Sequence, residues 1–326
     1  MSADVLVRAT GLTKHYRVRT VDGPRRLTAV DDVDLQVDAG TTTALVGESG
    51  CGKSTTGRLL LALERPTAGS VEIDGTDLST LSGREMRRAR RDFQAVFQDP
   101  YDSLNGRMSI AQILTEPSRV HRVADGDHRS VADLLELVGL GASFADQYPH
   151  ELSGGQRQRV AIARAIALEP RFVVCDEAVS ALDVSVQAQV VNVLRALQRE
   201  LGLAYLFISH DLALVRHVAD RTAVMYLGRV VERGRTEALF GDARHPYTQL
   251  LLAAAPRPRP RERTDRRAVA QAGELPSPLH RPPGCVFSSR CPLATERCTT
   301  EVPALREVAG REVACHYAET AQVTAS

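Results

Sequence analysis

The sequence predicts an α/β fold. Three short apolar runs, Thr43–Val46, Phe172–Cys175 and Ala204–Ile208, have the length and composition of buried strands. Each run is followed by polar or glycine-containing residues, and the first leads directly into a helix-forming segment. Buried strands that alternate with helical segments are typical of α/β proteins.

The composition indicates an ordinary globular protein with more than one domain. The 326 residues are 43% hydrophobic and 25% charged, and this length exceeds what one hydrophobic core usually serves. No apolar run reaches the roughly 18 residues of a membrane span, and "MSADVLVRATGL" lacks the pattern of a secretory signal. We therefore expect a protein of the cytosol with reduced thiols. The net charge of +1 gives no electrostatic reason to expect nucleic-acid binding.

A glycine-rich segment follows the first predicted strand. In "LVGESGCGKSTTGRLL" the spacing of Gly47, Gly52, Lys53 and Ser54 matches G-x-x-x-x-G-K-[ST]. In such a loop the backbone N–H groups bind phosphate oxygens, the lysine reaches the β- and γ-phosphates, and the serine hydroxyl binds Mg²⁺. We expect Cys51 to be a small filler within it. The predicted phosphate site comprises Gly47, Glu48, Ser49, Gly50, Cys51, Gly52, Lys53, Ser54 and Thr55.

Two adjacent carboxylates follow the second predicted strand. In "RFVVCDEAVSALDVS", Asp176 ends the strand and Glu177 comes next. Phosphoryl transfer to water uses one carboxylate to hold Mg²⁺ and a base to orient or deprotonate the attacking water. We expect Asp176 to hold the metal through water and Glu177 to act on the attacking water.

A second anion-binding helix start lies between these motifs. "ELSGGQRQRVAIARAIAL" places Ser153, Gly154, Gly155 and Gln156 in front of an apolar-striped helix. With both phosphate-binding ends in one chain, residues 1–255 resemble the ATP-binding subunits of ABC transporters. The resemblance implies a P-loop NTPase with a RecA-like core, an antiparallel β subdomain and an α-helical subdomain at residues 99–152. It also implies that Ser153–Gln156 of one subunit cover the ATP of another.

The resemblance assigns further residues one at a time. Tyr16 in "LTKHYRV" matches the aromatic that stacks on adenine, with a plain strand tyrosine as the alternative. Gln98 in "AVFQDP" matches the glutamine that links metal and water to the helical subdomain. Asp183 in "SALD" matches the aspartate that communicates across the dimer, or else caps a helix, and His210 in "LFISHDL" matches the γ-phosphate histidine. The implied catalytic residues are Glu177, His210 and Gln98, and the implied Mg²⁺ ligands are Ser54, Gln98 and Asp176.

The sequence layout favours a transporter subunit. Ser54 and Leu152 are too close in sequence for the long coiled coils of DNA-handling ABC proteins. "VFQDPYDSLNGRMSI", "HPYTQLLLAAAP" and "LPSPLHRPPGC" resemble oligopeptide/dipeptide importers, and the first stretch is similar to the second ATPase of their pair, although Gly106 stands where relatives often have proline. The implied function is ATP-driven peptide import. The alternatives are import of nickel, glutathione, an opine or a sugar, a non-transport ABC ATPase, and a metal- or redox-sensing switch.

The resemblance also implies the partners and the location. A second, related ATPase would pair head to tail with this chain. Two membrane permease subunits would hold the pair at the cytoplasmic face of the cell membrane as a peripheral protein. An extracytoplasmic substrate-binding protein would select the cargo, and no nucleic acid is involved.

After Ala255 the composition changes abruptly to "PRPRPRERTDRR". Such Pro- and Arg-rich stretches are typical of stiff, solvated linkers. The predicted domains are therefore an ATP-binding domain at residues 1–255, a linker at 256–275 and a cysteine-rich extension at 276–326.

Four cysteines of the extension, Cys285, Cys291, Cys298 and Cys315, have the spacing C-x5-C-x6-C-x16-C. Four thiolates can hold either Zn²⁺ or an iron–sulfur cluster, and the close C-x2-C pairs typical of structural zinc sites are missing. The residue chemistry alone leaves both metals open. The extension, including "RCPLA" and "VACHY", resembles those of peptide-importer ATPases, which implies one [4Fe–4S] cluster with a structural or regulatory role.

Overall fold

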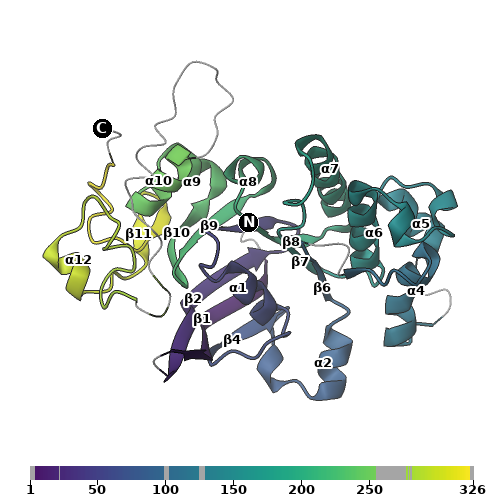
Figure 1. Ribbon diagram of the computed structural model, residues 1–326, viewed down its shortest axis with the longest axis horizontal. Helices are drawn as coiled ribbons and strands as arrows, with labels where there is room; N and C mark the ends of the chain where they lie inside the picture. The colour runs from purple at the N-terminus through teal and green to yellow at the C-terminus, as the bar shows by residue number, and fades with distance from the viewer. Residues whose placement is uncertain are drawn as a thin grey trace. The chain divides into compact units, whose positions relative to one another are not determined.

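The computed structural model describes residues 4–21, 23–98, 103–124, 129–254, 277, 279 and 281–323 (Figure 1). It divides into two compact units. The first unit comprises Met1–Val7, Gln36–Thr42 and Glu72–Ile208, and the second comprises Arg8–Leu35, Thr43–Val71 and Ser209–Ser326. The predicted linker at 256–275 lies outside the described residues.

The first unit contains three parallel strands in the order β8-β7-β6. Their bounds are β6 (Phe93–Val96), β7 (Phe172–Asp176) and β8 (Ala204–Ser209). The strands β7 and β8 confirm two of the predicted buried runs. Because all three strands run the same way, the residues that follow them lie at one edge of the sheet.

Four described helices of the first unit begin at serine caps, and a fifth, α7, begins after Asp183. These helices are α2 (Gly83–Ala89), α4 (Ile110–His121), α5 (Val131–Leu137), α6 (Gly154–Ile166) and α7 (Val184–Leu201), with 3₁₀ turns at Leu78–Thr80, Ala142–Phe144 and Pro149–Glu151. Ser109, Ser130 and Ser153 each form a capping box with the residue three positions later, which fixes where α4, α5 and α6 begin. The helices α4 and α5 both pack against α6 (Figure 1).

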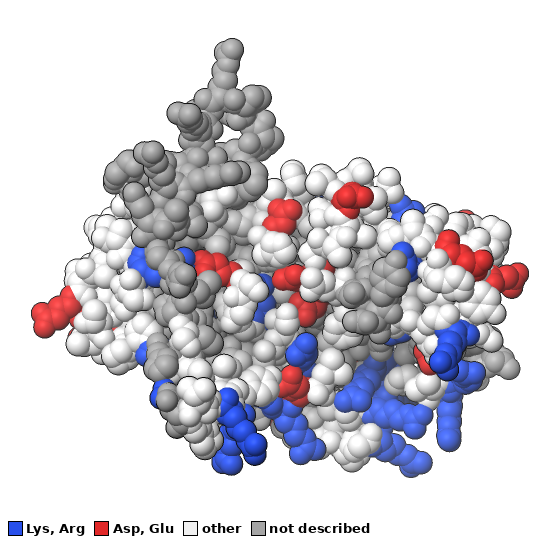
Figure 2. Space-filling view, in the orientation of Figure 1, with Lys and Arg blue, Asp and Glu red and all other residues white. Residues whose placement is uncertain are grey.

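Arginine side chains gather on one face of the first unit. Helix α2 and the residue after it carry exposed Arg84, Arg87, Arg88 and Arg90. Arg87 donates to the carbonyl oxygen of Val120, at the end of α4. In the view of Figure 2 this is the lower region where most of the blue side chains lie.

The second unit contains a sheet in the order β11-β12-β10-β9-β3. Strand β3 (Thr42–Val46) runs parallel to β9 (Arg221–Tyr226). Strand β3 confirms the predicted buried run at Thr43–Val46. The strands β10 (Arg229–Arg235), β12 (Arg311–Val313) and β11 (Arg306–Val308) continue the sheet in antiparallel fashion. Its helices are α1 (Lys53–Leu60), α8 (Leu212–Val218), α9 (Thr236–Gly241), α10 (Pro246–Ala254) and α12 (Glu296–Thr300).

Long strands form the other sheet of the chain. The strands β2 (Gly23–Asp38), β1 (Val5–Thr20) and β4 (Ala68–Ile73) pair in that order, and most of their residues belong to the second unit. The last two residues of β4, Glu72 and Ile73, pair antiparallel with β5 (Thr76–Asp77) and form a short hairpin in the first unit. No helix in the described ranges is both long and apolar enough to cross a membrane.

The cysteine-rich extension is built onto the sheet of the second unit. Strand β12 pairs with β10, with Val313 opposite Glu232. Phe287 is 1% exposed, and its ring lies 5.2 Å from that of Tyr226 and 5.4 Å from that of Tyr247. The extension therefore shares a hydrophobic core with β9, which contains Tyr226, and with α10, which contains Tyr247.

Candidate nucleotide site

The loop between β3 and α1 has a backbone that only glycine can adopt at two positions. Gly47 has φ 154° and Gly52 has φ 108°. A Cβ atom at Gly47 would lie 2.2 Å from the carbonyl oxygen of Met225, and one at Gly52 would lie 2.2 Å from that of Ala29. Both distances are far shorter than a non-bonded contact between carbon and oxygen. Glycine at these positions therefore lets the loop pack closely against β9 at Gly47 and against β2 at Gly52.

Lys53 lies over this loop. Its side chain is almost fully buried, and Nζ donates to the carbonyl oxygens of Gly47 (2.8 Å) and Glu48 (2.9 Å). Cys51 Sγ lies 3.9 Å from the same Nζ. Burial raises the pKa of the Cys51 thiol, so this residue stays neutral beside the ammonium group.

Tyr16 lies on β1, beside the first turn of α1. Its hydroxyl donates to Glu64 Oε2 at 2.5 Å, and the hydroxyl group of Thr55 is a second hydrogen-bond partner. Lys14 Nζ lies 3.3 Å from Glu64 Oε2 and 5.2 Å from the centre of the Tyr16 ring. Burial and the hydrogen bond to Glu64 raise the pKa of Tyr16, so its hydroxyl stays protonated. The hydrogen bond from this hydroxyl to Glu64 fixes the position of the ring.

Asp176 and Glu177 lie at the carboxyl edge of the sheet in the first unit. Asp176 is the last residue of β7 and is in register with Ile208. Glu177 has φ 50°, an uncommon conformation for a residue with a Cβ atom. Ser180 Oγ donates to the carbonyl oxygen of Glu177 at 2.9 Å. Gln98 follows β6 at the same edge and is exposed.

The predicted second anion-binding helix start is the exposed N-terminus of α6. The backbone N–H of Ser153 donates to Gln156 Oε1 at 2.8 Å, and the N–H of Gln156 donates to Ser153 Oγ at 3.3 Å. A Cβ atom at Gly155 would lie 2.4 Å from Val186 Cγ1. Because glycine has no Cβ atom, the first turns of α6 and α7 can lie close together. Asp183 precedes α7 and is exposed, and its carboxylate makes no capping hydrogen bond to that helix.

The predicted nucleotide residues divide between the two units. The second unit brings together Tyr16 and the loop of residues 47–55, and it also holds exposed His210, which precedes α8. The first unit holds Gln98, Ser153–Gln156, Asp176, Glu177 and Asp183.

The four cysteines of the extension line one small cavity, together with Phe287, Leu293 and Tyr317. The backbone N–H of Cys285 donates to the carbonyl oxygen of Cys298 at 2.8 Å, which joins two of the cysteine-bearing segments. Burial raises the pKa of Cys285 to about 11 and that of Cys291 to about 12, and it also raises the pKa of Cys315. Nowhere in the described ranges do three or more His, Cys, Asp or Glu side chains converge closely enough to hold a metal ion.

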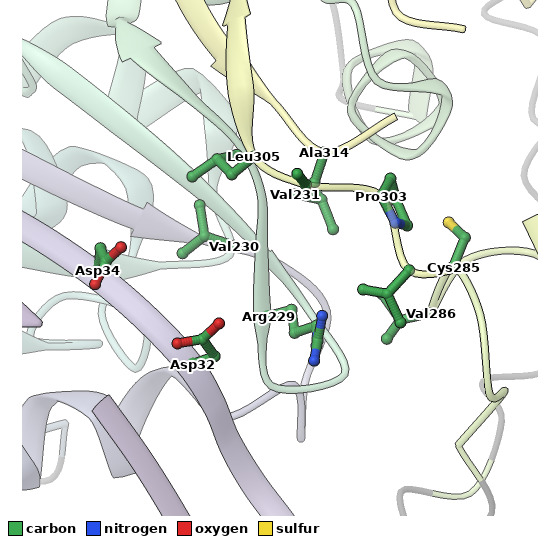
Figure 3. A pocket seen from close by; sticks show the side chains of 12 residues that line it. Asp32, Asp34, Arg229, Val230, Val231, Cys285, Val286, Pro303, Leu305 and Ala314 are labelled. Atoms are coloured by element: carbon green, nitrogen blue, oxygen red, sulfur yellow. The ribbon is translucent and has the colours of Figure 1, made fainter. Parts of the chain in front are cut away.

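Cys285 also lines a larger cavity of about 310 Å³ (Figure 3). Carboxylates of Asp32 and Asp34 on β2 lie at one end of it, and Arg229 lies at the start of β10. Apolar side chains of the extension, among them Val286 and Pro303, line the opposite end (Figure 3).

Sequence reasoning missed three contacts around the loop. The N–H of Glu48 donates to the hydroxyl of Tyr247 at 3.0 Å, and its carboxylate accepts two hydrogen bonds from Arg290. Tyr226 lies beside both of these residues. The two contacts of Glu48 join residues 199 and 242 positions apart, and the contacts of Tyr226 depend on side-chain packing, so no local pattern could have indicated them.

Comparisons with known proteins agree with this geometry. Residues 30–180 match the family model for the ABC transporter, and residues 231–298 match that for the oligopeptide/dipeptide transporter, C-terminal region. A probable peptide ABC transporter ATP-binding protein of Sinorhizobium fredii is 51% identical over 96% of this chain and 90% of its own length. This chain belongs to the ATP-binding proteins of peptide ABC transporters. The prediction of the family from sequence is thereby confirmed.

Other relatives of this peptide transporter ATP-binding protein agree. The di/tripeptide transport ATP-binding protein DppF of Pseudomonas aeruginosa is 47% identical and covers 97% of this chain and 98% of its own length. Among solved structures, cbiO1 of Clostridium perfringens, part of an ABC transporter complex, has a TM-score of 0.64 at 26% identity over 73% of this chain and 92% of its own. A dimeric ATP-binding cassette in a post-hydrolysis state with ADP and Pi has a TM-score of 0.62 at 28% identity over 71% of this chain and 99% of its own. These matches confirm the α/β ABC ATPase fold.

Proposed function

We propose that this ATPase subunit of a peptide ABC importer binds Mg²⁺-ATP on the loop of residues 47–55 and hydrolyses it with Glu177 as general base. The observation that carries the proposal is the loop itself, with glycines at the two positions where a Cβ atom would clash and Lys53 buried above it. Backbone N–H groups in such a loop, together with the N-terminus of α1, suit a polyphosphate.

Each residue of the loop then has a separate task. The Lys53 ammonium reaches the β- and γ-phosphates from its place above the carbonyls of Gly47 and Glu48. The Ser54 hydroxyl would hold Mg²⁺, and Tyr16 would stack on the adenine with its hydroxyl still bonded to Glu64.

Hydrolysis requires a second set of residues on the parallel sheet of the first unit. Asp176 would hold Mg²⁺ through water, and Glu177 would take the proton of the attacking water. Gln98 would hold the metal and orient that water, and His210 of the second unit would contact the γ-phosphate. Gln98, Asp176 and Glu177 follow neighbouring parallel strands, and this arrangement supports a shared task.

Two such ATPases pair head to tail, this chain with a related but different one, and it serves as the second ATPase of that pair. Ser153, Gly154, Gly155 and Gln156 of this chain then bind the ATP held by the partner's loop, and Asp183 communicates across the dimer. The N-terminus of α6 supports this, because Ser153 is exposed there and the first N–H groups of a helix have no carbonyl partner within it.

The assembled importer includes two membrane permease subunits and an extracytoplasmic binding protein that delivers di- or oligopeptides. The ATPase pair lies at the cytoplasmic face of the membrane, where the helical subdomain of residues 99–152 receives the permeases. The chain is organised as an ATP-binding domain at 1–255, a linker at 256–275 and an extension at 276–326.

Cys285, Cys291, Cys298 and Cys315 hold one [4Fe–4S] cluster. The donor set fits, because four cysteines line a single cavity. The close C-x2-C pairs typical of structural zinc sites are missing from this segment, which favours the cluster over Zn²⁺. When bound, the cluster supplies a cross-link between segments of the extension and a centre that can carry one electron.

Copurification tests this function. Affinity-tagged chain extracted from its own membranes is expected to bring with it the second ATPase and both permeases. A chain that hydrolyses ATP and never copurifies with membrane subunits would instead support a non-transport ABC ATPase.

A further inference from the structure

An arginine of the cysteine-rich extension binds the phosphate-binding loop. Arg290 Nη1 donates to Glu48 Oε2 at 2.9 Å and to Oε1 at 3.1 Å. The Arg290 side chain is 8% exposed and that of Glu48 is 23% exposed, so water screens this ion pair only in part. Glu48 directly follows Gly47 in the loop, and its carboxylate is the group that contacts the extension.

Arg290 is itself held in place from several sides. Its backbone N–H donates to the carbonyl oxygen of Phe287 at 3.0 Å. Its guanidinium carbon lies 5.8 Å from the centre of the Tyr226 ring and 6.0 Å from that of Phe287, within the range of cation–π contacts. The position of Arg290 thus depends on the packing of the extension against β9.

Glu48 is fixed at its main chain as well. Its N–H donates to the hydroxyl of Tyr247, and the ring of Tyr247 packs on Tyr226 at 4.6 Å. Its carbonyl oxygen accepts from Lys53 Nζ. A shift of the Glu48 peptide would therefore move the lysine ammonium that lies over the phosphate-binding loop.

We infer that Arg290 is a positioning residue for the nucleotide site: by binding Glu48, the extension holds the phosphate-binding loop in the conformation that accepts ATP. This rests on the proposed role of residues 47–55 as the ATP site. A loop held ready by outside contacts loses less conformational entropy on binding, which raises its affinity. Arg290 directly precedes Cys291, so whatever orders the cysteine segment also places this guanidinium.

Equilibrium titration of the full chain with a fluorescent ATP analogue and Mg²⁺ tests the inference. Arg290→Gln and Glu48→Gln are each expected to raise the Kd about five- to tenfold, as expected when one partner of a charge-assisted hydrogen bond is removed. The double variant is expected to bind no more weakly than either single variant, because both changes remove the same interaction. Arg290→Lys, which keeps the charge, is expected to fall between wild type and Arg290→Gln.

Arg297→Gln is the matched control. Arg297 forms an exposed ion pair with Glu301 in the same extension, at 2.7 Å. This variant is expected to bind the analogue with wild-type affinity. Melting temperatures taken with and without ATP separate positioning from general stability, because a purely structural role would lower both temperatures equally and leave the ATP-induced rise unchanged.

Two outcomes would overturn the inference in distinguishable ways. Wild-type affinity in Arg290→Gln, alongside a loss in Lys53→Ala, would remove the positioning role and leave the ATP site where it is. Wild-type affinity in both variants would remove the proposed site itself. If Arg290→Gln fails to fold, Glu48→Gln still decides, because it leaves every residue of the extension unchanged.

Discussion

The backbone N–H of Glu177 donates to the carbonyl oxygen of Ile208 at 3.0 Å. This bond holds Glu177 at the end of β8 although its own strand stops at Asp176. With φ 50°, Glu177 turns away from the strand direction, and the backbone on both sides is fixed by hydrogen bonds. A backbone fixed in this way suits a residue whose side chain must place one water molecule accurately.

Glu177→Gln is expected to bind ATP normally and to lose turnover by about 10²- to 10⁴-fold, because the amide keeps the size of the side chain and cannot accept a proton. A closed dimer with trapped ATP should accumulate. Phosphate release by the assembled transporter measures the loss. Glu136→Gln, on the exposed surface of α5, serves as the control, and near-wild-type turnover in Glu177→Gln would refute the assigned role.

Lys53→Ala is expected to weaken binding of Mg²⁺-ATP about 10- to 100-fold, through loss of a buried charge-assisted hydrogen bond to phosphate. Isothermal titration of the purified chain measures it. Arg84→Ala, on the exposed helix α2 outside the proposed site, should change the affinity little. Equal Kd values for Lys53→Ala and wild type would be incompatible with the proposed site.

Ser153→Ala is expected to impair the composite site that contains the partner's phosphate-binding loop. The measurement combines this variant with a wild-type partner ATPase and compares occupancy of the two sites after photolabelling with an azido-ATP. Labelling should fall at the partner's loop and persist at the loop of residues 47–55. Loss confined to the site built on Lys53 would contradict the head-to-tail pairing.

Cys291→Ser is expected to lose the iron–sulfur cluster. Anaerobically purified wild-type chain should be brown, with broad visible absorption and about four irons per chain, and the variant should be colourless. Cys175→Ala, in buried β7, should keep its iron. Colourless wild-type protein with one zinc per chain would identify the site as a zinc site.

The sequence was sufficient to predict the strands that carry the site. The runs at β3, β7 and β8 are apolar without alternation, because neighbours cover both faces, and this makes them recognisable. The glycine spacing around Lys53 was equally informative, since two of those positions tolerate no Cβ atom.

The extension was harder to predict. Its strands β11 and β12 have three residues each, too few for a period of two to appear. Its core depends on Phe287 packing against Tyr226 and Tyr247, which lie far away in the sequence. The contact between Arg290 and Glu48 joins residues 242 positions apart, and only the folded chain brings them together.

ATP hydrolysis by this chain is expected to drive peptide import. The most direct test reconstitutes the two ATPases and two permeases in liposomes and measures ATP turnover as peptide-loaded binding protein is added. Turnover is expected to rise with loaded binding protein, peptide should accumulate on the ATPase-bearing side, and Glu177→Gln should stop both. ATP turnover that ignores the loaded binding protein, with no movement of peptide, would contradict the claim.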